Sequence, residues 1–422
     1  MSWDTPKARA FLERVFNVAV ESAQPFNAIQ KHLPEPPRGR CVVVGAGKAS
    51  AAMAAALDTS WPDVDLSGVV VTRYGHSVPA GRIEVLEASH PVPDEMSVEA
   101  ARRMFAAVAD LKPEDLVVSL MSGGGSSLLI APAGAMTMAD KREVNRTLLM
   151  SGATISEMNT IRRKLSLIKG GRLAQAAHPA KVVTLAISDV PGDDPADIAS
   201  GPTVEPLGLD ERALDVARRY GMDLPQAAWD VLRSPDTAPV VWHPQIRTKV
   251  VASPGMALVA CAEVAREYGV TPLMLGDALQ GEAKEAGRLM AGIATSAKRN
   301  GQPIKGPALL LSGGETTVTM GKEFRGRGGR NTEFLLSLAI ELKGADGIWA
   351  VAGDTDGIDG SEDAAGAFVK PTTIHQMKES GIDPRKCLVD HDSYIAFRAI
   401  EDLLITGPTL TNVNDVRAIL VV

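Results

Sequence analysis

The sequence has few aromatic residues, few cysteines and no long apolar run. Aromatic residues make up 4% of the 422 residues, which argues against a single-strand nucleic-acid binder because such proteins need stacking platforms. The three cysteines, Cys41, Cys261 and Cys387, are too scattered for a disulfide framework or a zinc motif. No apolar run approaches the roughly 20 residues of a membrane span, and the first residues form no secretory signal. We therefore expect a reduced, cytoplasmic location.

The charge balance is mildly acidic. There are 44 Lys and Arg residues against 51 Asp and Glu residues, so the net charge is −7. No basic cluster is evident, so neither nucleic acid nor a membrane is an expected partner. The apolar content of 45% and the charged content of 23% are typical of a globular protein, and the length corresponds to two or three domains. These values, with 39 glycines and 27 prolines, predict an α/β enzyme.

Short apolar segments alternate with helical patterns in the first half of the chain. Residues 41–44 predict a buried strand, which a glycine turn connects to an alanine-rich helix ending near Leu57. Strands that are apolar throughout and separated by helices indicate a parallel sheet covered on both faces. Further strands of this kind are predicted at residues 68–72, 83–86, 116–120 and 182–187.

The pattern changes between residues 207 and 249, where prolines interrupt short helices. We place the domain boundary there, with a Rossmann-like α/β domain at residues 1–238 and a smaller α/β domain with a mixed sheet at residues 239–422. The strands expected in the second domain are residues 250–252, 272–275, 308–311 and 348–352.

A glycine-rich turn follows the first predicted strand. A dinucleotide fingerprint would need Gly or Ala where Ser50 stands and an acid at the end of the next strand, where Arg73 stands. A Walker motif would need Ser or Thr in place of Ala49. What remains is Lys48 in the first turn of a helix, which is either an anion-binding residue beside backbone N–H groups or an ordinary surface lysine.

Three consecutive glycines follow the strand predicted at residues 116–120. Gly123, Gly124 and Gly125 let the backbone wrap tightly, and the hydroxyl groups of Ser126 and Ser127 come next. Such a nest suits phosphate oxygens, so we predict that these residues bind phosphate. The alternative is a flexible turn, although three glycines carry a large cost in backbone entropy.

Two acidic loops also follow predicted strands. Asp189 and Asp193 share one loop, and Asp354 lies in the other. Mg²⁺ takes one or two carboxylates together with substrate phosphates, so these three residues are candidate metal ligands. Each aspartate could instead cap a helix or close an Asx-turn. The sequence does not rank the two loops.

A second glycine-rich loop carries Arg325, Arg327 and Arg330 before a helix predicted from Asn331. A guanidinium group can form two parallel hydrogen bonds to a carboxylate or a phosphate. We select Arg330 because it is closest to the helix start, and we expect the other two to face solvent. His90 lies in a loop after a strand, with no partner evident in the sequence, and a structural hydrogen bond is one interpretation of it.

The motifs occur in a fixed order along nearly the whole chain. The first domain has them at residues 45–50, 122–127, 188–193 and 200–203, and the second at residues 312–316, 328–331, 353–357 and 408–415. Together they resemble the class II glycerate 2-kinases, which end in a Leu-rich MOFRL domain. One departure is Thr332, which stands where a glutamine is expected after the Arg–Asn pair.

The resemblance implies ATP-dependent phosphorylation of D-glycerate at its 2-hydroxyl, with ATP and Mg²⁺ as cofactors. It also implies an active site in the cleft between the two domains. By position, Lys48 and Arg330 match the proposed catalytic pair of that family. The glycine nest would then hold ATP, and the acidic loops would hold the metal. We further expect substrate binding by Asn331, Glu315 and His90. A monomer or a homodimer is expected, with a small molecule as the only partner.

Two other functions are compatible with parts of the sequence. Proteins resembling this one are also labelled hydroxypyruvate reductases, which would require an NAD(P)H site. The second predicted strand is not followed by an acid that could bind the ribose hydroxyl of NADH, which argues against that site. Arg73 could nevertheless bind the 2′-phosphate of NADPH. A nucleotide-binding regulatory module would explain the glycine nest but would leave Lys48, Arg330 and the acidic loops without a role.

Overall fold

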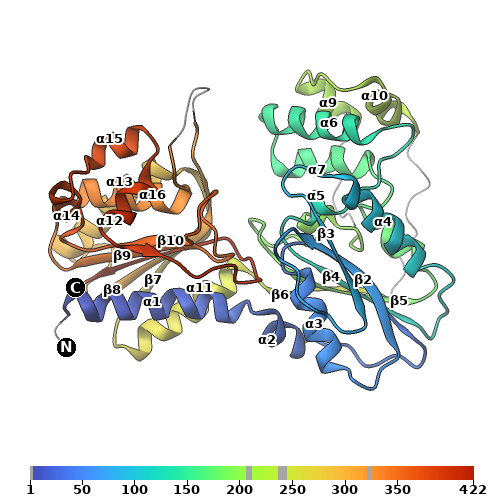
Figure 1. Ribbon diagram of the computed structural model, residues 1–422, viewed down its shortest axis with the longest axis horizontal. Helices are drawn as coiled ribbons and strands as arrows, with labels where there is room; N and C mark the ends of the chain where they lie inside the picture. Colours follow the sequence, from blue (N-terminus) through green and yellow to red (C-terminus); the bar gives the residue numbers. More distant parts are fainter. Residues whose placement is uncertain (1–2, 206–211, 236–244, 321–325) are drawn as a thin grey trace. The chain divides into compact units, whose positions relative to one another are not determined.

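The computed structural model describes residues 3–205, 212–235, 245–320 and 326–422, which form two compact units (Figure 1). Residues Pro25–Val251 form one unit, called here the parallel-sheet unit. Residues Met1–Gln24 and Ala252–Val422 form the other, called the mixed-sheet unit. Each unit has its own six-stranded sheet and its own hydrophobic core.

The parallel-sheet unit has the strand order β3-β2-β1-β4-β5-β6. Every neighbouring pair from β3 to β5 is parallel, and the central strands β1 and β4 are buried along their whole length. Such strands need apolar residues on both faces, which is why their sequences are continuous apolar runs. The strands are β1 (Cys41–Ala46), β2 (Leu66–Arg73), β3 (Ile83–Ala88), β4 (Leu116–Met121), β5 (Lys181–Ile187) and β6 (Ile246–Ala252).

Helices pack against this sheet and carry its connections. One core cluster joins Met104 of the fourth helix to Val42 and Val117 of the central strands. Asp94 caps the N-terminus of the fourth helix, because its side chain accepts the N–H of Ser97. The helices near the sheet are α2 (Pro25–Gln30), α3 (Ser50–Ser60), α4 (Glu95–Ala107), α5 (Gly125–Leu128) and α8 (Arg172–Ala176), with a 3₁₀ turn η1 (Ile198–Ser200).

Four more helices of this unit share a separate apolar cluster, which includes Val144, Leu148, Ile161 and Val216. They are α6 (Met138–Met150), α7 (Ile155–Lys164), α9 (Ala213–Arg219) and α10 (Gln226–Arg233). Both α6 and α7 begin with a capping box, in which a threonine and an acid three residues later satisfy each other's backbone N–H. Side chains of α6 and α7 contribute to the candidate functional site.

The mixed-sheet unit has the strand order β11-β10-β9-β12-β8-β7. Only the β7–β8 pair is parallel, and the other pairs are antiparallel. The expected combination of a parallel sheet and a mixed sheet is therefore confirmed. The strands are β7 (Thr271–Glu282), β8 (Ala308–Thr317), β9 (Ile348–Asp354), β10 (Gly366–Val369), β11 (Leu403–Leu404) and β12 (Asp415–Val421).

Helices cover both faces of the mixed sheet (Figure 1). Two long helices, α1 (Thr5–Ser22) and α11 (Pro254–Glu267), pack against each other and against one face. On the other face, α13 (Arg330–Leu342) packs on β9 and β10 and is nearly buried from end to end. The remaining helices are α12 (Ala283–Asn300), α14 (Thr373–Glu379), α15 (Pro384–Val389) and α16 (Ser393–Arg398).

The units divide the chain differently from the expected ranges 1–238 and 239–422. The boundary expected at residues 238 and 239 lies outside the described residues. Helix α1 belongs to the mixed-sheet unit because its apolar face packs there: Val15 accepts a hydrogen bond from Cys261 Sγ at 3.3 Å, and the Phe16 ring fills the space beside Gly353. The sequence alone did not indicate that this N-terminal helix packs in the unit formed by the C-terminal part of the chain.

No helix among the described residues is both long and apolar enough to cross a membrane. The three cysteines are free. Burial raises the pKa of Cys41 and of Cys261 to about 12. These two thiols are therefore packing groups at neutral pH, since the reactive species would be the thiolate.

Candidate functional site

Lys48 lies in a turn whose backbone N–H groups are already bonded. The turn connects β1 to α3, and the N–H of Gly47 donates to the carbonyl of Val71 at 3.1 Å. The N–H of Lys48 donates to the carbonyl of Gly123 at 2.8 Å, and that of Ala49 donates to Ser122 Oγ at 3.0 Å. The turn is therefore locked against the loop after β4. The Lys48 side chain is half-buried.

The glycine nest brings Lys48 and His90 together. Gly124 has a φ of 80°, which favours glycine, and a Cβ at this position would lie 3.0 Å from the His90 ring. The same position is 3.5 Å from Cγ of Lys48. The absence of a side chain at Gly124 thus lets a histidine and a lysine, more than forty residues apart in sequence, approach the same loop.

A cavity of about 500 Å³ opens beside the nest. Its volume is within the usual range for a small-molecule site. Of the five residues predicted to bind ATP, Gly124, Ser126 and Ser127 line it, whereas Gly125 packs against Ala199 and Gly123 holds the Lys48 N–H. The other lining residues are His90, Pro91, Val92, Pro93, Arg142, Asn145, Arg146, Leu149 and Arg162.

The cavity is lined by both cationic and apolar side chains. The arginines come from α6 and α7, whereas the apolar residues come from the loop after β3 and from the end of α6. Val92 and Leu149 are exposed, at 58% and 71%. Exposed apolar side chains beside cations suit a ligand with a flat apolar part and an anionic part.

The acidic loop after β5 contains a buried carboxylate oxygen for which the described residues offer no hydrogen-bond partner. Asp193 has a φ of 55°, and its Oδ1 is buried without a hydrogen-bond partner among the described residues. Asp194 instead accepts the N–H of Ala196 at 2.9 Å, as an Asx-turn does. Asp189 is half-buried in the same loop. No group of three or more His, Cys, Asp or Glu side chains is placed to hold a metal in the described part of the chain.

Arg330 is the centre of a cluster of carboxylates in the mixed-sheet unit. Its Nε donates to both oxygens of Asp415 at 2.8 and 3.0 Å, and its Nη2 donates to Asp354 at 2.7 Å. Its Nη1 donates to Glu315 at 2.7 Å. Arginine has five N–H donors, so two remain for a ligand.

The sheet explains why these carboxylates meet. Strand β12 lies between β8 and β9 and is antiparallel to both. Its first residue, Asp415, is therefore in register with Gly314, near the end of β8, and with Asp354, the last residue of β9. Arg330 is the first residue of α13, whose N-terminus is capped by Asp359. The carboxylate of Asp359 accepts the N–H groups of Asn331 and Thr332, each at 2.9 Å.

The surrounding carboxylates stabilise the positive charge of Arg330. Burial disfavours the charged guanidinium, but the carboxylates of Asp415, Asp354 and Glu315 outweigh it and raise the pKa of Arg330 above its ordinary value. Asp415 also accepts a hydrogen bond from Arg417, which is 2% exposed. Burial lowers the pKa of Arg417. Arg330 is thus a permanently charged and well-oriented group.

Four residues selected from the sequence surround Arg330 or its partners. Asn331 is fully buried, and its Nδ2 donates to Asp415 at 2.8 Å. Glu315 is exposed apart from its pair with Arg330. Asp354 accepts from Arg330 through Oδ2 and from the N–H of Asp356 through Oδ1. Thr332, the departure from the family pattern, donates its hydroxyl to Asp359 at 2.9 Å.

The two other loop arginines are placed differently. Arg327 is exposed and pairs with Glu362, as expected for a solvent-facing residue. Arg325 lies outside the described residues.

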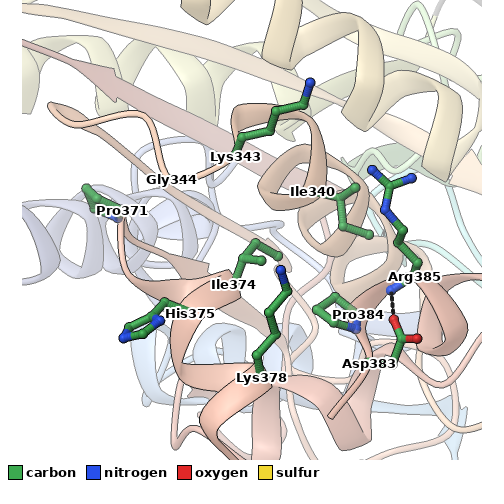
Figure 2. A pocket seen from close by; sticks show the side chains of 10 residues that line it. All are labelled: Ile340, Lys343, Gly344, Pro371, Ile374, His375, Lys378, Asp383, Pro384 and Arg385. Atoms are coloured by element: carbon green, nitrogen blue, oxygen red, sulfur yellow. Dashed lines mark hydrogen bonds between the residues drawn. The ribbon is translucent and has the colours of Figure 1, made fainter.

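A second basic hollow lies in the mixed-sheet unit (Figure 2). It has a volume of about 420 Å³, and Figure 2 shows Lys343, Lys378 and Arg385 around it. All three side chains are exposed, and the N–H of Arg385 donates to Asp383 at 3.0 Å. None of the residues selected from the sequence lines this hollow, so we do not assign the site to it.

Sequence reasoning missed two kinds of residue. Asp415 belongs to a motif that was recognised, but a single acid at a strand start carries no distinguishing pattern. Arg162 belongs to a segment in which no acidic residue occurs between Glu157 and Asp189, although six basic residues do. That asymmetry is a signal for a buried or ligand-facing basic group, and the overall net charge concealed it.

Comparison with known proteins identifies the family. Residues 11–233 match the family described as domain of unknown function DUF4147, and residues 308–415 match the MOFRL family. The D-glycerate 2-kinase of Thermotoga maritima is 38% identical over 98% of each chain. The chain belongs to the MOFRL-containing glycerate kinase family.

Relatives in the glycerate kinase family carry two different names. The crystal structure of glycerate kinase from Thermotoga maritima matches with a TM-score of 0.89 at 38% identity, covering 99% of this chain and 100% of that one. A protein of Agrobacterium vitis, provisionally named a hydroxypyruvate reductase, is 64% identical over 100% of this chain and 96% of its own length. The resemblance found in the motifs is thus confirmed.

Proposed function

We propose that the protein is an ATP-dependent D-glycerate 2-kinase. The observation that carries the proposal is the cavity beside the glycine nest, where Ser126, Ser127 and arginines from α6 and α7 adjoin exposed apolar side chains. This lining matches a nucleotide, with its phosphates toward the hydroxyl and guanidinium groups and its base toward Pro91 and Val92. The names of the glycerate kinase relatives support the choice of acceptor.

The turn after β1 argues against a nicotinamide site. In a dinucleotide-binding fold, free N–H groups of this turn and of the helix start bind the pyrophosphate. Here the N–H groups of Gly47, Lys48 and Ala49 donate to Val71, Gly123 and Ser122. The next strand ends in Arg73 and presents no acid to a ribose. A reductase would therefore lack the contact between this turn and the pyrophosphate, and the acid that binds the ribose.

Lys48 and Arg330 have electrostatic roles in the proposed reaction. Phosphoryl transfer needs little covalent chemistry from the protein, so positioning and charge stabilisation supply most of the rate enhancement. Lys48, whose stem passes the nest, would stabilise negative charge on the transferred group. Arg330, held by three carboxylates, would direct its remaining donors to a carboxylate or phosphoryl oxygen. We assign glycerate binding to His90 and Glu315, whereas Asn331, which was also expected to bind substrate, is fully buried and would orient Asp415 beside Arg330.

The residues present fit a magnesium ion. Asp193 has a buried oxygen without a hydrogen-bond partner among the described residues, whereas both oxygens of Asp354 accept hydrogen bonds. Mg²⁺ needs only one or two carboxylates when phosphates supply other ligands. We therefore propose Asp193, with Asp189, as the protein ligands and regard Asp354 as a partner of Arg330. When bound, the ion would neutralise phosphate charge.

The reaction class is tested with purified protein. We expect ADP formation that requires both D-glycerate and a divalent cation, with phosphate appearing on the 2-hydroxyl of the product. We expect no oxidation of NADH or NADPH with hydroxypyruvate, because the N–H groups of Gly47, Lys48 and Ala49 are already bonded within the protein. A coupled ADP assay and absorbance at the nicotinamide band give the two readouts. Reduced-nicotinamide consumption without ADP formation would refute the proposal.

The metal assignment predicts a selective effect of Asp193→Asn. The amide keeps the size of the side chain but loses the charge, so the Mg²⁺ concentration for half-maximal activity should rise about 10-fold or more, with a smaller change in the rate at saturating Mg²⁺. Asp194→Asn is the matched control because its oxygen serves a turn. An unchanged magnesium titration for Asp193→Asn would remove this residue from the metal site.

A further inference from the structure

Three cationic side chains gather in the parallel-sheet unit behind the wall of the cavity. Lys141 lies in α6, Arg162 in the last turn of α7, and Lys169 in the segment before α8. Lys141 and Lys169 are each only 1% exposed, and both rank among the largest fully buried side chains of the protein. Burying an ammonium group is costly unless it is paired.

Lys141 has no pairing group in the described structure. Its Nζ is buried and has no hydrogen-bond partner among the described residues. Burial, and then the charge of Arg162, lowers the pKa of Lys141 to about 8. Burial, with the charges of Lys141 and Arg162, also lowers the pKa of Lys169 well below its ordinary value. The protein therefore keeps three mutually repelling groups together.

The surrounding acids are engaged elsewhere. Asp197, just before η1, accepts hydrogen bonds from Asn159 at 2.8 Å and from Arg163 at 3.3 Å, and its charge also acts on Arg162. Helix α10 also packs against α6. Its charged residues are Asp230, which accepts a hydrogen bond from Gln226, and Arg233, which lies over the Trp229 ring.

The cation cluster is connected to the glycine nest. Nζ of Lys169 donates to the carbonyl of Ser126 at 2.7 Å, while Arg162 and Ser126 both line the cavity. Lys141 is one helical turn from Asn145, another lining residue, but its own side chain lies with Val144 and Leu148 on the buried face of α6, behind the lining residues. The cluster is therefore next to the cavity surface formed by the nest.

A strained segment supports this arrangement. Ala199 and Ser200 have φ values of 53° and 60°, a region that residues with side chains rarely occupy. Ser200 Oγ hydrogen-bonds to Ser126 Oγ at 2.8 Å and donates to Asn159 at 3.2 Å, and the Ala199 carbonyl accepts from Lys169 at 3.4 Å. Strain of this kind clusters at functional sites.

We propose that Lys141, Arg162 and Lys169 form a subsite for a phosphoryl group beside the cavity, reached at Arg162, with Lys141 as its unpaired cation. The inference rests on the proposed function for the source of that group, which is either the nucleotide or the phosphorylated product. A bound phosphoryl group supplies the negative charge that the cluster lacks. It also explains why a buried lysine without a partner is present at all.

The test replaces Lys141 by methionine, which matches its length and has no charge. Lys141→Met should weaken the binding of ATP, ADP, 2-phosphoglycerate or inorganic phosphate about 10-fold or more, measured by isothermal titration calorimetry. The same variant should unfold at a higher temperature without ligand, because an unpaired buried cation is removed. Arg102→Met is the matched control, since Arg102 is exposed and pairs with Glu99.

The four ligands distinguish the source of the phosphoryl group. A loss confined to ATP and ADP assigns the subsite to the nucleotide, and a loss confined to 2-phosphoglycerate assigns it to the product. Loss for inorganic phosphate as well shows that the phosphoryl group alone is recognised. Wild-type affinity of Lys141→Met for all four ligands would overturn the inference.

Proton uptake by the unmodified protein gives a test that needs no variant. The pKa of Lys141 without ligand is about 8, and a bound anion should raise it. Binding should thus be accompanied by proton uptake, and the uptake should be larger at pH 9 than at pH 8. The second pKa of a phosphate monoester is about 6, so 2-phosphoglycerate is almost fully ionised at both pH values and is the ligand used here. Calorimetry in two buffers of different ionisation enthalpy measures the uptake, and its absence at both pH values would contradict the proposal.

The two proposals fail in different ways. A wild-type protein that makes no 2-phosphoglycerate but binds inorganic phosphate through Lys141 would retain the subsite and defeat the kinase assignment. If the wild-type protein is an active kinase and the Lys141→Met variant binds every phosphorylated ligand normally, the kinase assignment stands and the subsite is refuted.

Discussion

Lys48→Ala should lower kcat by ~10²–10⁴-fold, or ~3–5 kcal/mol, which is the effect of losing a key electrostatic group in phosphoryl transfer. The structure supports the size of this effect because Lys48 has a fixed position. Its backbone N–H donates to the carbonyl of Gly123, and its stem passes the side-chain-free face of Gly124. A positioned charge requires no reorganisation when negative charge develops.

The measurement is steady-state kinetics with ATP, Mg²⁺ and D-glycerate, and circular dichroism shows whether the variant is folded. Lys112→Ala removes an exposed lysine of the same unit and should leave kcat unchanged. Lys48→Arg should recover part of the activity, because charge matters more than shape for a group that acts as a point charge. A folded Lys48→Ala variant with near-normal kcat would make Lys48 an ordinary surface residue.

Arg330→Lys should lower kcat/KM for glycerate by ~10²-fold, or about 2.7 kcal/mol. Lysine keeps the charge but cannot bond Asp415, Asp354 and Glu315 at once, as Arg330 does. The replacement therefore loses the donors that face a ligand and the contacts that orient them. We also expect a lower melting temperature, because buried Asp415 would lose part of its pairing.

Arg327→Lys is the matched control for this change. Arg327 lies in the same glycine-rich loop but is exposed and pairs with Glu362, so its replacement should alter neither kcat/KM nor the melting temperature. If Arg330 only stabilises the fold, Arg330→Lys would lower the melting temperature while the folded enzyme kept its kcat/KM. That result would remove Arg330 from the proposed catalytic pair.

Most strands were predictable because buried strands leave a direct trace in the sequence, but β10, β11 and β12 were not predicted, and residues 250–252, expected in the second domain, belong to β6 of the first sheet. Residues 41–44 were predicted as a strand, and β1 is Cys41–Ala46. The glycine and acid motifs follow β1, β4, β5 and β9. Ligand-binding groups gather at strand ends in α/β sheets, so a local pattern indicated candidate regions.

The partners of each candidate residue were not predictable, because they come from distant parts of the chain. Arg330 bonds Asp415, which is 85 residues away, and Asp359 caps a helix that begins 29 residues before it. Lys141 stands in an amphipathic helix with a capping box, a setting in which a lysine normally faces solvent. Only the packing of α6 against its neighbours buries it.

The sequence by itself therefore determined the fold class and the family and indicated candidate loops for the site, because hydrophobic period, glycine turns and motif order are local properties. The tertiary structure decided which charges are paired. It left Asp193 Oδ1 and Lys141 Nζ buried without partners among the described residues, and it surrounded Arg330 with carboxylates. Burial and pairing depend on contacts between segments far apart in the chain, and those contacts set the electrostatics on which the proposed chemistry depends.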